Sequence, residues 1–142
     1  MKKTLVLMLI IFSCAVTQAA TTRSVHRDTG TYAVIEIPWE ADATGAVQSF
    51  QIDKICGFVL QVTTVPGTPA PTDLYDVSLR DADTVDIMGN ALADRSATVA
   101  EQAVPYIGAT YSPRYVCSQL TVSILNNAVV GAQGTVVLYV AR

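Results

Sequence analysis

The chain has 142 residues, with nine Lys and Arg, twelve Asp and Glu, and a formal net charge of −3. A surface that binds nucleic acid or anionic lipid needs clustered Lys and Arg, whereas the arginines here are scattered along the sequence, so both are poor candidates as partners. The length fits one domain with an adequate hydrophobic core.

The first 19 residues have the pattern of an export signal. Lys2 and Lys3 give a positive start, residues 5–12 form an apolar run, and residues 17–19 end in the small-residue pattern that precedes cleavage. We predict cleavage after Ala19, with Ala20 as the second choice. A retained membrane anchor is the alternative, but the run is shorter than the roughly 20 residues that span a bilayer. Lipidation of Cys14 is a further alternative, which the bulky Phe12 disfavours.

Removing residues 1–19 leaves 123 residues, which include seven basic and twelve acidic residues and have a net charge of −5. Residues 20–30 are small and polar and predict a flexible N-terminal arm, which could also pair with a neighbouring subunit. His26 is the single histidine of the chain and has no second His or Cys nearby. We therefore predict that it is solvated and binds no metal.

Seven segments have the apolar or alternating pattern of β-strands: residues 31–39, 47–52, 55–64, 74–80, 85–88, 115–125 and 135–141. Residues 91–104 are the one segment that could form a helical turn or two. The pattern predicts an all-β fold, a single antiparallel β-sandwich or jelly-roll-like domain of about seven strands over residues 31–142.

Two cysteines, Cys56 and Cys117, remain after the signal segment is removed. In an oxidising compartment such a pair suggests one disulfide. Regular alternation places Cys56 inward with Phe58 and Cys117 outward with Gln119, so a bond requires a bulge that shifts the register. The sequence leaves this disulfide open.

Asp81, Asp83 and Asp86 are the best candidates for a metal site, and they are weak ones. Their spacing begins like a calcium-binding loop, but Val85 stands where the third ligand belongs and Leu92 stands where the closing Glu belongs. The alternative is a solvated acidic turn between two strands.

The sequence points to no reaction. With its single histidine in the predicted arm, a Ser-His-Asp or Cys-His arrangement is nearly excluded, and the sequence holds no glycine-rich phosphate loop. We expect a protein that is not an enzyme and binds no cofactor.

Four aromatic residues could form a platform for sugar rings: Trp39, Tyr106, Tyr111 and Tyr115. Packing in the core or at strand ends is the commoner use of such residues. In a binding module, the three tyrosines would form the ligand loop, over residues 105–115.

The segment from Pro71 to Arg95 resembles a group of small virion-associated proteins of tailed phages. The shared features are Pro71, Thr72-Asp73, Tyr75-Asp76-Val77, Leu79, Asp81, Val85-Asp86-Ile87-Met88-Gly89 and Asp94-Arg95. The C-terminal hairpin, with Leu120, Val122, Asn126 and Gly134-Thr135-Val136-Val137, is also similar. The resemblance covers roughly residues 55–141 and implies a β-sandwich subunit of a phage particle, with no catalytic residues to carry over.

Two functional hypotheses follow. The first is a structural subunit of a virion or an extracellular assembly, which associates with itself or with other subunits through its arm and edge strands. The export signal and the two cysteines favour extracellular or periplasmic use of the same domain. The second is a secreted or periplasmic module that binds glycan or peptide through Tyr106, Tyr111 and Tyr115.

Overall fold

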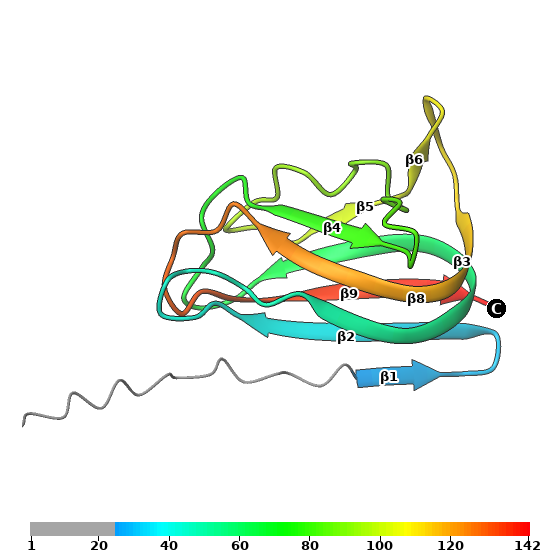
Figure 1. Cartoon of the computed structure of the whole chain (residues 1–142), viewed down its shortest axis with the longest axis horizontal. Helices are drawn as coiled ribbons and strands as arrows, with labels where there is room; N and C mark the ends of the chain where they lie inside the picture. The colour runs from blue at the N-terminus through cyan, green and yellow to red at the C-terminus, as the bar shows by residue number, and fades with distance from the viewer. Residues whose placement is uncertain (1–24) are drawn as a thin grey trace, which may run out of the picture.

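The computed structural model describes residues 25–142, so the predicted signal segment and residues 20–24 of the predicted arm lie outside the described residues. Over the described range, the regular elements are all β-strands, and no helix is long and apolar enough to cross a membrane. The strands are β1 Val25–Asp28, β2 Tyr32–Glu40, β3 Phe50–Pro66, β4 Asp76–Arg80, β5 Glu101–Ala103, β6 Tyr106–Ile107, β7 Thr110–Tyr111, β8 Arg114–Leu125 and β9 Gln133–Ala141 (Figure 1).

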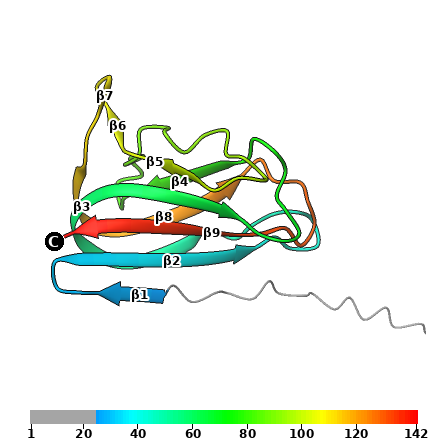
Figure 2. The same cartoon turned by 180° about the vertical axis from the view of Figure 1, so that it is seen from behind.

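Seven strands form one antiparallel sheet in the order β1-β2-β9-β3-β8-β4, with β5 beside β3, and β6 and β7 form a separate two-stranded ribbon. The first half of β3 pairs with β8 and the second half pairs with β9. The sheet curves along this long strand, so its two halves enclose a shared core (Figure 2). The predicted all-β antiparallel fold of about seven strands is confirmed.

A bulge joins two predicted strands into one. The sequence suggested separate strands at residues 47–52 and 55–64, whereas β3 runs from Phe50 to Pro66 with a register shift between Ile52 and Ile55. Both isoleucines are buried and the two charged residues between them are exposed. Regular alternation cannot bury residues three positions apart, and the extra residue of a bulge can.

Part of the predicted arm is a strand. Residues 25–28 form β1 and pair with β2, and Arg27 lies 3.6 Å from the carboxylate of Glu36. A tight turn follows, in which the amide of Gly30 (φ +85°) donates to the Asp28 carboxylate. The segment therefore forms an edge strand in this range. The side chain of His26 lies outside the described part of the molecule.

The core lies between the two halves of the sheet and is closed by the loop after β4. Ile37 and Leu138 come from one half and Leu79 and Leu120 from the other, each at most 1% exposed. The loop adds three buried side chains, Ile87, Met88 and Leu92. The loop therefore covers the open side of the core.

The predicted helical turns at residues 91–104 are absent. This range contains turns and the short strand β5, and the predicted strand at 85–88 is reduced to one bridge between Arg80 and Asp86. Asn90 and Asp94 have positive φ values of 65° and 53°. Residues in this left-handed conformation interrupt a right-handed helix.

Trp39 belongs to the core, which corrects its placement in a sugar platform. Its side chain is 2% exposed, and its ring centroid is 5.8 Å from that of Tyr75. The indole lies against Gly134, where a Cβ atom would be 2.6 Å from the ring. Gly134 is therefore required by the close approach of the ring.

Cys56 and Cys117 are joined by a disulfide that crosses β3 and β8. The two residues are directly opposite in the register, with Cα atoms 3.9 Å apart, and both are exposed. The prediction that Cys56 points inward is wrong. After the bulge the buried positions are Ile55, Gly57 and Val59, so Cys56 falls on the outer face together with Cys117.

Reducing this bond should destabilise the protein. The cysteines are 61 residues apart, and closing a loop of that length stabilises a fold by about 2–4 kcal/mol. Urea unfolding with and without dithiothreitol measures the difference. The Cys56→Ser/Cys117→Ser double variant should have the same free energy of unfolding as the reduced wild type, and dithiothreitol should not change it. Two titratable thiols in the native, unreduced protein would contradict the prediction.

Candidate functional site

The carboxylates of Asp81 and Asp86 accept hydrogen bonds from backbone amides. Asp81 accepts hydrogen bonds from the amides of Asp83 (3.1 Å) and Val85 (2.9 Å). Asp86 accepts from the amides of Met88 (3.0 Å) and Asn90 (2.7 Å). Over residues 25–142, no three His, Cys, Asp or Glu side chains gather in a way that could hold a metal ion. The structure therefore does not bring Asp81, Asp83 and Asp86 together.

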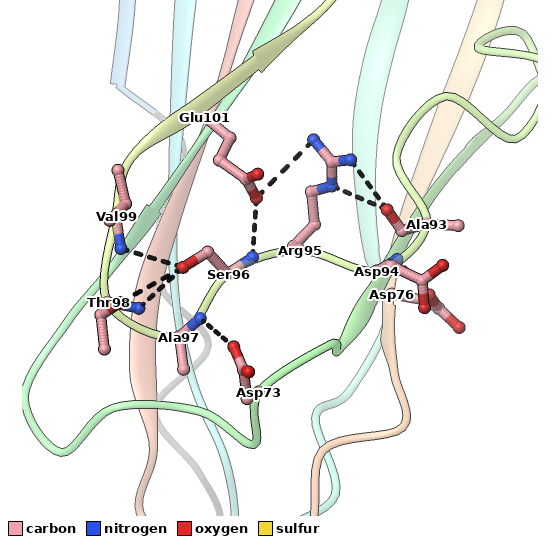
Figure 3. Close-up of polar contacts among 10 residues, drawn as sticks. All are labelled: Asp73, Asp76, Ala93, Asp94, Arg95, Ser96, Ala97, Thr98, Val99 and Glu101. Atoms are coloured by element: carbon pink, nitrogen blue, oxygen red, sulfur yellow. Dashed lines mark hydrogen bonds and ion pairs between the residues drawn. The ribbon is translucent and has the colours of Figure 1, made fainter.

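Three more carboxylates accept hydrogen bonds from the later part of the loop after β4 (Figure 3). Asp73 accepts from the amide of Ala97 (3.1 Å), Asp76 accepts from the amide of Asp94 (2.8 Å), and Glu101 accepts from the amide of Ser96 (2.7 Å). Arg95 adds two hydrogen bonds to the carbonyl of Ala93. These contacts show that Asp73 and Asp76 of the Pro71–Arg95 motif, together with Glu101, fold the loop onto the sheet.

Tyr75 is the buried centre of the motif. Its side chain is fully buried, and its hydroxyl has no hydrogen-bond partner among the described residues. Burial raises the pKa of the Tyr75 phenol, and the Glu101 carboxylate adds to this, while Arg95 acts in the opposite direction. Ionisation of this hydroxyl is therefore less favourable in the folded protein than in the unfolded chain.

The three tyrosines of the predicted ligand loop form two separate groups. Tyr106 and Tyr111 face each other across β6 and β7, with ring centroids 4.8 Å apart, and Tyr111 is 70% exposed. Tyr115 instead packs edge-on against Phe58 of β3, at 5.3 Å. The tyrosine pair thus lies on a ribbon that projects from the body of the molecule, at the end where β9 finishes (Figures 1 and 2).

The base of this ribbon is bound to the loop after β4, which contains the second half of the Pro71–Arg95 motif. The amide of Tyr106 donates to the carbonyl of Met88 (3.0 Å), and Arg114 donates from Nη1 to the carbonyl of Asp86 (3.1 Å). Gly89 (φ +60°) leaves room for this contact, since a Cβ atom there would lie 1.8 Å from the carbonyl oxygen of Tyr106. The glycine of the motif is required by the docking of the ribbon.

An exposed row of aromatic side chains crosses the outer face of the sheet, and we call it the aromatic row. Tyr32, Phe58 and Tyr115 are 52%, 48% and 58% exposed. The register places Tyr32 opposite Ala141, Ala141 opposite Phe58, and Phe58 opposite Tyr115. Sequence reasoning does not identify Phe58, because regular alternation places it on the inner face together with Cys56, and it does not identify Tyr32, because the pairing of the strands is needed to bring it into the row. Recognising the bulge would have placed it outside.

An apolar groove of about 360 Å³ adjoins this row. It lies beside the second register shift of β3, between Val59 and Gln61. Its lining residues are Tyr32, Ala33, Val34, Leu60, Gln61, Tyr139 and Val140. Because none of them is charged, the groove offers apolar surface and tyrosine side chains to a partner.

The loop contacts predict a contrast between two neighbouring carboxylates. Asp86→Ala removes the acceptor of two amides and should lower the free energy of unfolding by about 2 kcal/mol, as expected for hydrogen bonds to a charged group. Asp83→Ala is the matched control, because the Asp83 side chain is exposed and accepts no hydrogen bond from the described residues. Urea unfolding measures both variants. Equal losses would contradict the assignment of Asp86 as a loop acceptor.

Tyr75 predicts a dependence of stability on alkaline pH. Because its pKa is raised in the folded state, its contribution is present below the ordinary tyrosine pKa of about 10 and is lost as the pH rises above it. Tyr75→Phe should remove this loss and cost little near neutral pH, since the hydroxyl has no partner to lose. Urea unfolding at about pH 9 and pH 11 tests this.

The control for the pH experiment is Tyr111→Phe, because that side chain is largely exposed. This variant should lose as much stability as the wild type on raising the pH. A Tyr75→Phe protein that is as alkali-sensitive as the wild type would show that Tyr75 is not responsible.

Comparison with known proteins shows a likeness to a solved structure. No family model and no curated protein match the sequence. Among solved structures, a chain of the capsid asymmetric unit of cyanophage Pam1 is similar, with a TM-score of 0.43 and 19% identity over 89% of this chain and 96% of that chain. The function is therefore inferred from the surfaces described above.

Proposed function

We propose that this chain is a non-enzymatic structural subunit that associates with copies of itself, or with other subunits, in a virion or an extracellular assembly. The observation that carries the proposal is the aromatic row. Three half-exposed aromatic rings, in register across four strands, form an apolar sheet face without a covering layer among the described residues.

The size of this face supports a binding role. Each aromatic side chain carries roughly 150–250 Å², so the exposed parts of Tyr32, Phe58 and Tyr115 present on the order of 300 Å². The half-exposed hydrophobics of the nearby ribbon add to this area. Apolar patches of this size on a monomer are often functional.

The edge strands at the two ends of the strand order, β4 and β1, differ in how they are covered. The β4 edge is covered, because the amide of Val77 donates to the carbonyl of Leu92 (3.0 Å) and the amide of Ile87 donates to that of Leu79 (2.9 Å). At the other end of the strand order, β1 pairs on one side with β2. Its outer side could accept a strand from a neighbouring subunit. This edge supports strand addition as a second route of association.

Two sequence features bear on the kind of assembly. The Pro71–Arg95 motif supports a phage particle, and the signal-like pattern of residues 1–19 supports an extracellular or periplasmic one. The non-enzymatic part of the proposal is supported by the use of the carboxylates around the loop after β4, because they accept hydrogen bonds from backbone amides.

A binding module for glycan or peptide is the second candidate. The observation that favours it is the Tyr106–Tyr111 pair, whose rings are presented on a projecting ribbon. Aromatic faces of this kind suit sugar rings and apolar peptide side chains. Such a module would be monomeric and would lose its ligand on Tyr111→Ala.

The structural proposal predicts self-association through the aromatic row. Sedimentation velocity of the chain from residue 20 onward should show a mass that rises with concentration. Phe58→Asp places a charge on a half-exposed position and should weaken association about tenfold, the effect of losing a central contact. Val99→Asp is the control, because Val99 is 60% exposed and lies outside the row. A wild-type chain that stays monomeric at the highest concentration would refute self-association.

A further inference from the structure

We infer that the β6–β7 ribbon binds the apolar groove of a second copy of this chain, and that two copies exchange ribbons reciprocally. The inference rests on the proposed self-association and adds which surfaces meet. It assigns the tyrosine pair of the ribbon to contact between subunits.

The ribbon has the properties of an inserting element. Residues 106–113 are all exposed, and the segment from residue 102 to residue 113 contains no charged side chain. Its large apolar groups are Tyr106, Ile107 and Tyr111. A two-stranded ribbon of this length is not stable alone, but its base is anchored on Met88 and Asp86. The chain thus holds an apolar tip away from its own core.

The groove has the complementary properties. It is concave and apolar, it is bordered by the aromatic row, and it carries tyrosine side chains that can meet the rings of the ribbon. Aromatic pairs of this kind add attraction beyond the burial of their area. Neither surface contains a charge, so their contact removes no ion from water.

The charge of the chain favours these surfaces for contact between copies. Residues 20–142 carry a net charge of −5, so two copies repel each other at long range. Repulsion is smallest where uncharged surfaces meet, and cores of interfaces are depleted of charged residues. The ribbon and the groove are therefore better contacts between like-charged copies than the acidic loops are.

Area and position favour a reciprocal exchange. One ribbon in one groove would cover on the order of 600 Å² in total, whereas two such contacts would cover about 1,200 Å², within the range of stable interfaces. The ribbon, the starts of β2 and β8 and the end of β9 lie at the same end of the molecule (Figures 1 and 2). Two copies related by a two-fold axis at this end can therefore exchange ribbons.

Variants of the chain from residue 20 onward, each with one introduced charge, test this contact. Tyr111→Lys alters the ribbon and Tyr32→Asp alters the groove, and both positions are at least half exposed, so both variants should fold. By sedimentation velocity, each alone should dimerise at least about tenfold more weakly than the wild type. An equimolar mixture should form heterodimers, since one contact is restored intact and the other gains an opposite-charge pair. Val130→Lys, which is 58% exposed and outside both surfaces, should dimerise like the wild type.

The outcomes separate the inference from the proposed function. A wild-type chain that is monomeric at every concentration overturns the ribbon exchange together with the self-association on which it rests. A wild type that associates equally well with Tyr111→Lys or Tyr32→Asp in place overturns the ribbon exchange and leaves the structural role intact. A mixture that associates no better than its separate variants also overturns the exchange.

Discussion

The fold depends on hydrogen bonds from backbone amides to the carboxylates of the loop after β4. Asp86 and Glu101 lie within or beside this loop, and Asp76 reaches it from the neighbouring strand. Turns built in this way need no regular secondary structure, because each carboxylate supplies the acceptor that a helix or a ladder would otherwise provide. The loop can then bring Ile87, Met88 and Leu92 over the open side of the curved sheet, where they complete the core.

The same loop determines where the exposed surfaces lie. Its Met88 carbonyl and Gly89 backbone receive Tyr106, and its Asp86 carbonyl receives Arg114, so both ends of the ribbon are attached to it. The acidic motif is therefore architectural, and its link to function is indirect. It holds an uncharged ribbon away from the core, and this ribbon is the element that we propose to contact a second copy.

The sequence predicts the strands well because alternation is a local property, and it fails where distant residues decide the structure. The two charged residues between Ile52 and Ile55 lie at a bulge that the sequence pattern does not reveal. This bulge moves Cys56 and Phe58 to the opposite face of the sheet. The helical turns at 91–104 are prevented by contacts such as that of Asp76 with Asp94, 18 residues away. The aromatic row needs the register of four strands, which no single segment contains.

The distribution of charge indicates how such a domain would associate. The β4 edge is closed by the loop, and the β1 edge carries Arg27 and Asp28, which pair with Glu36 and Arg142. Charged side chains on an edge strand oppose the addition of further strands. The aromatic row, the groove and the ribbon contain no charged side chain. Because desolvating them costs less than desolvating the charged edge, contact between faces should dominate, and strand pairing at β1 can only supplement it.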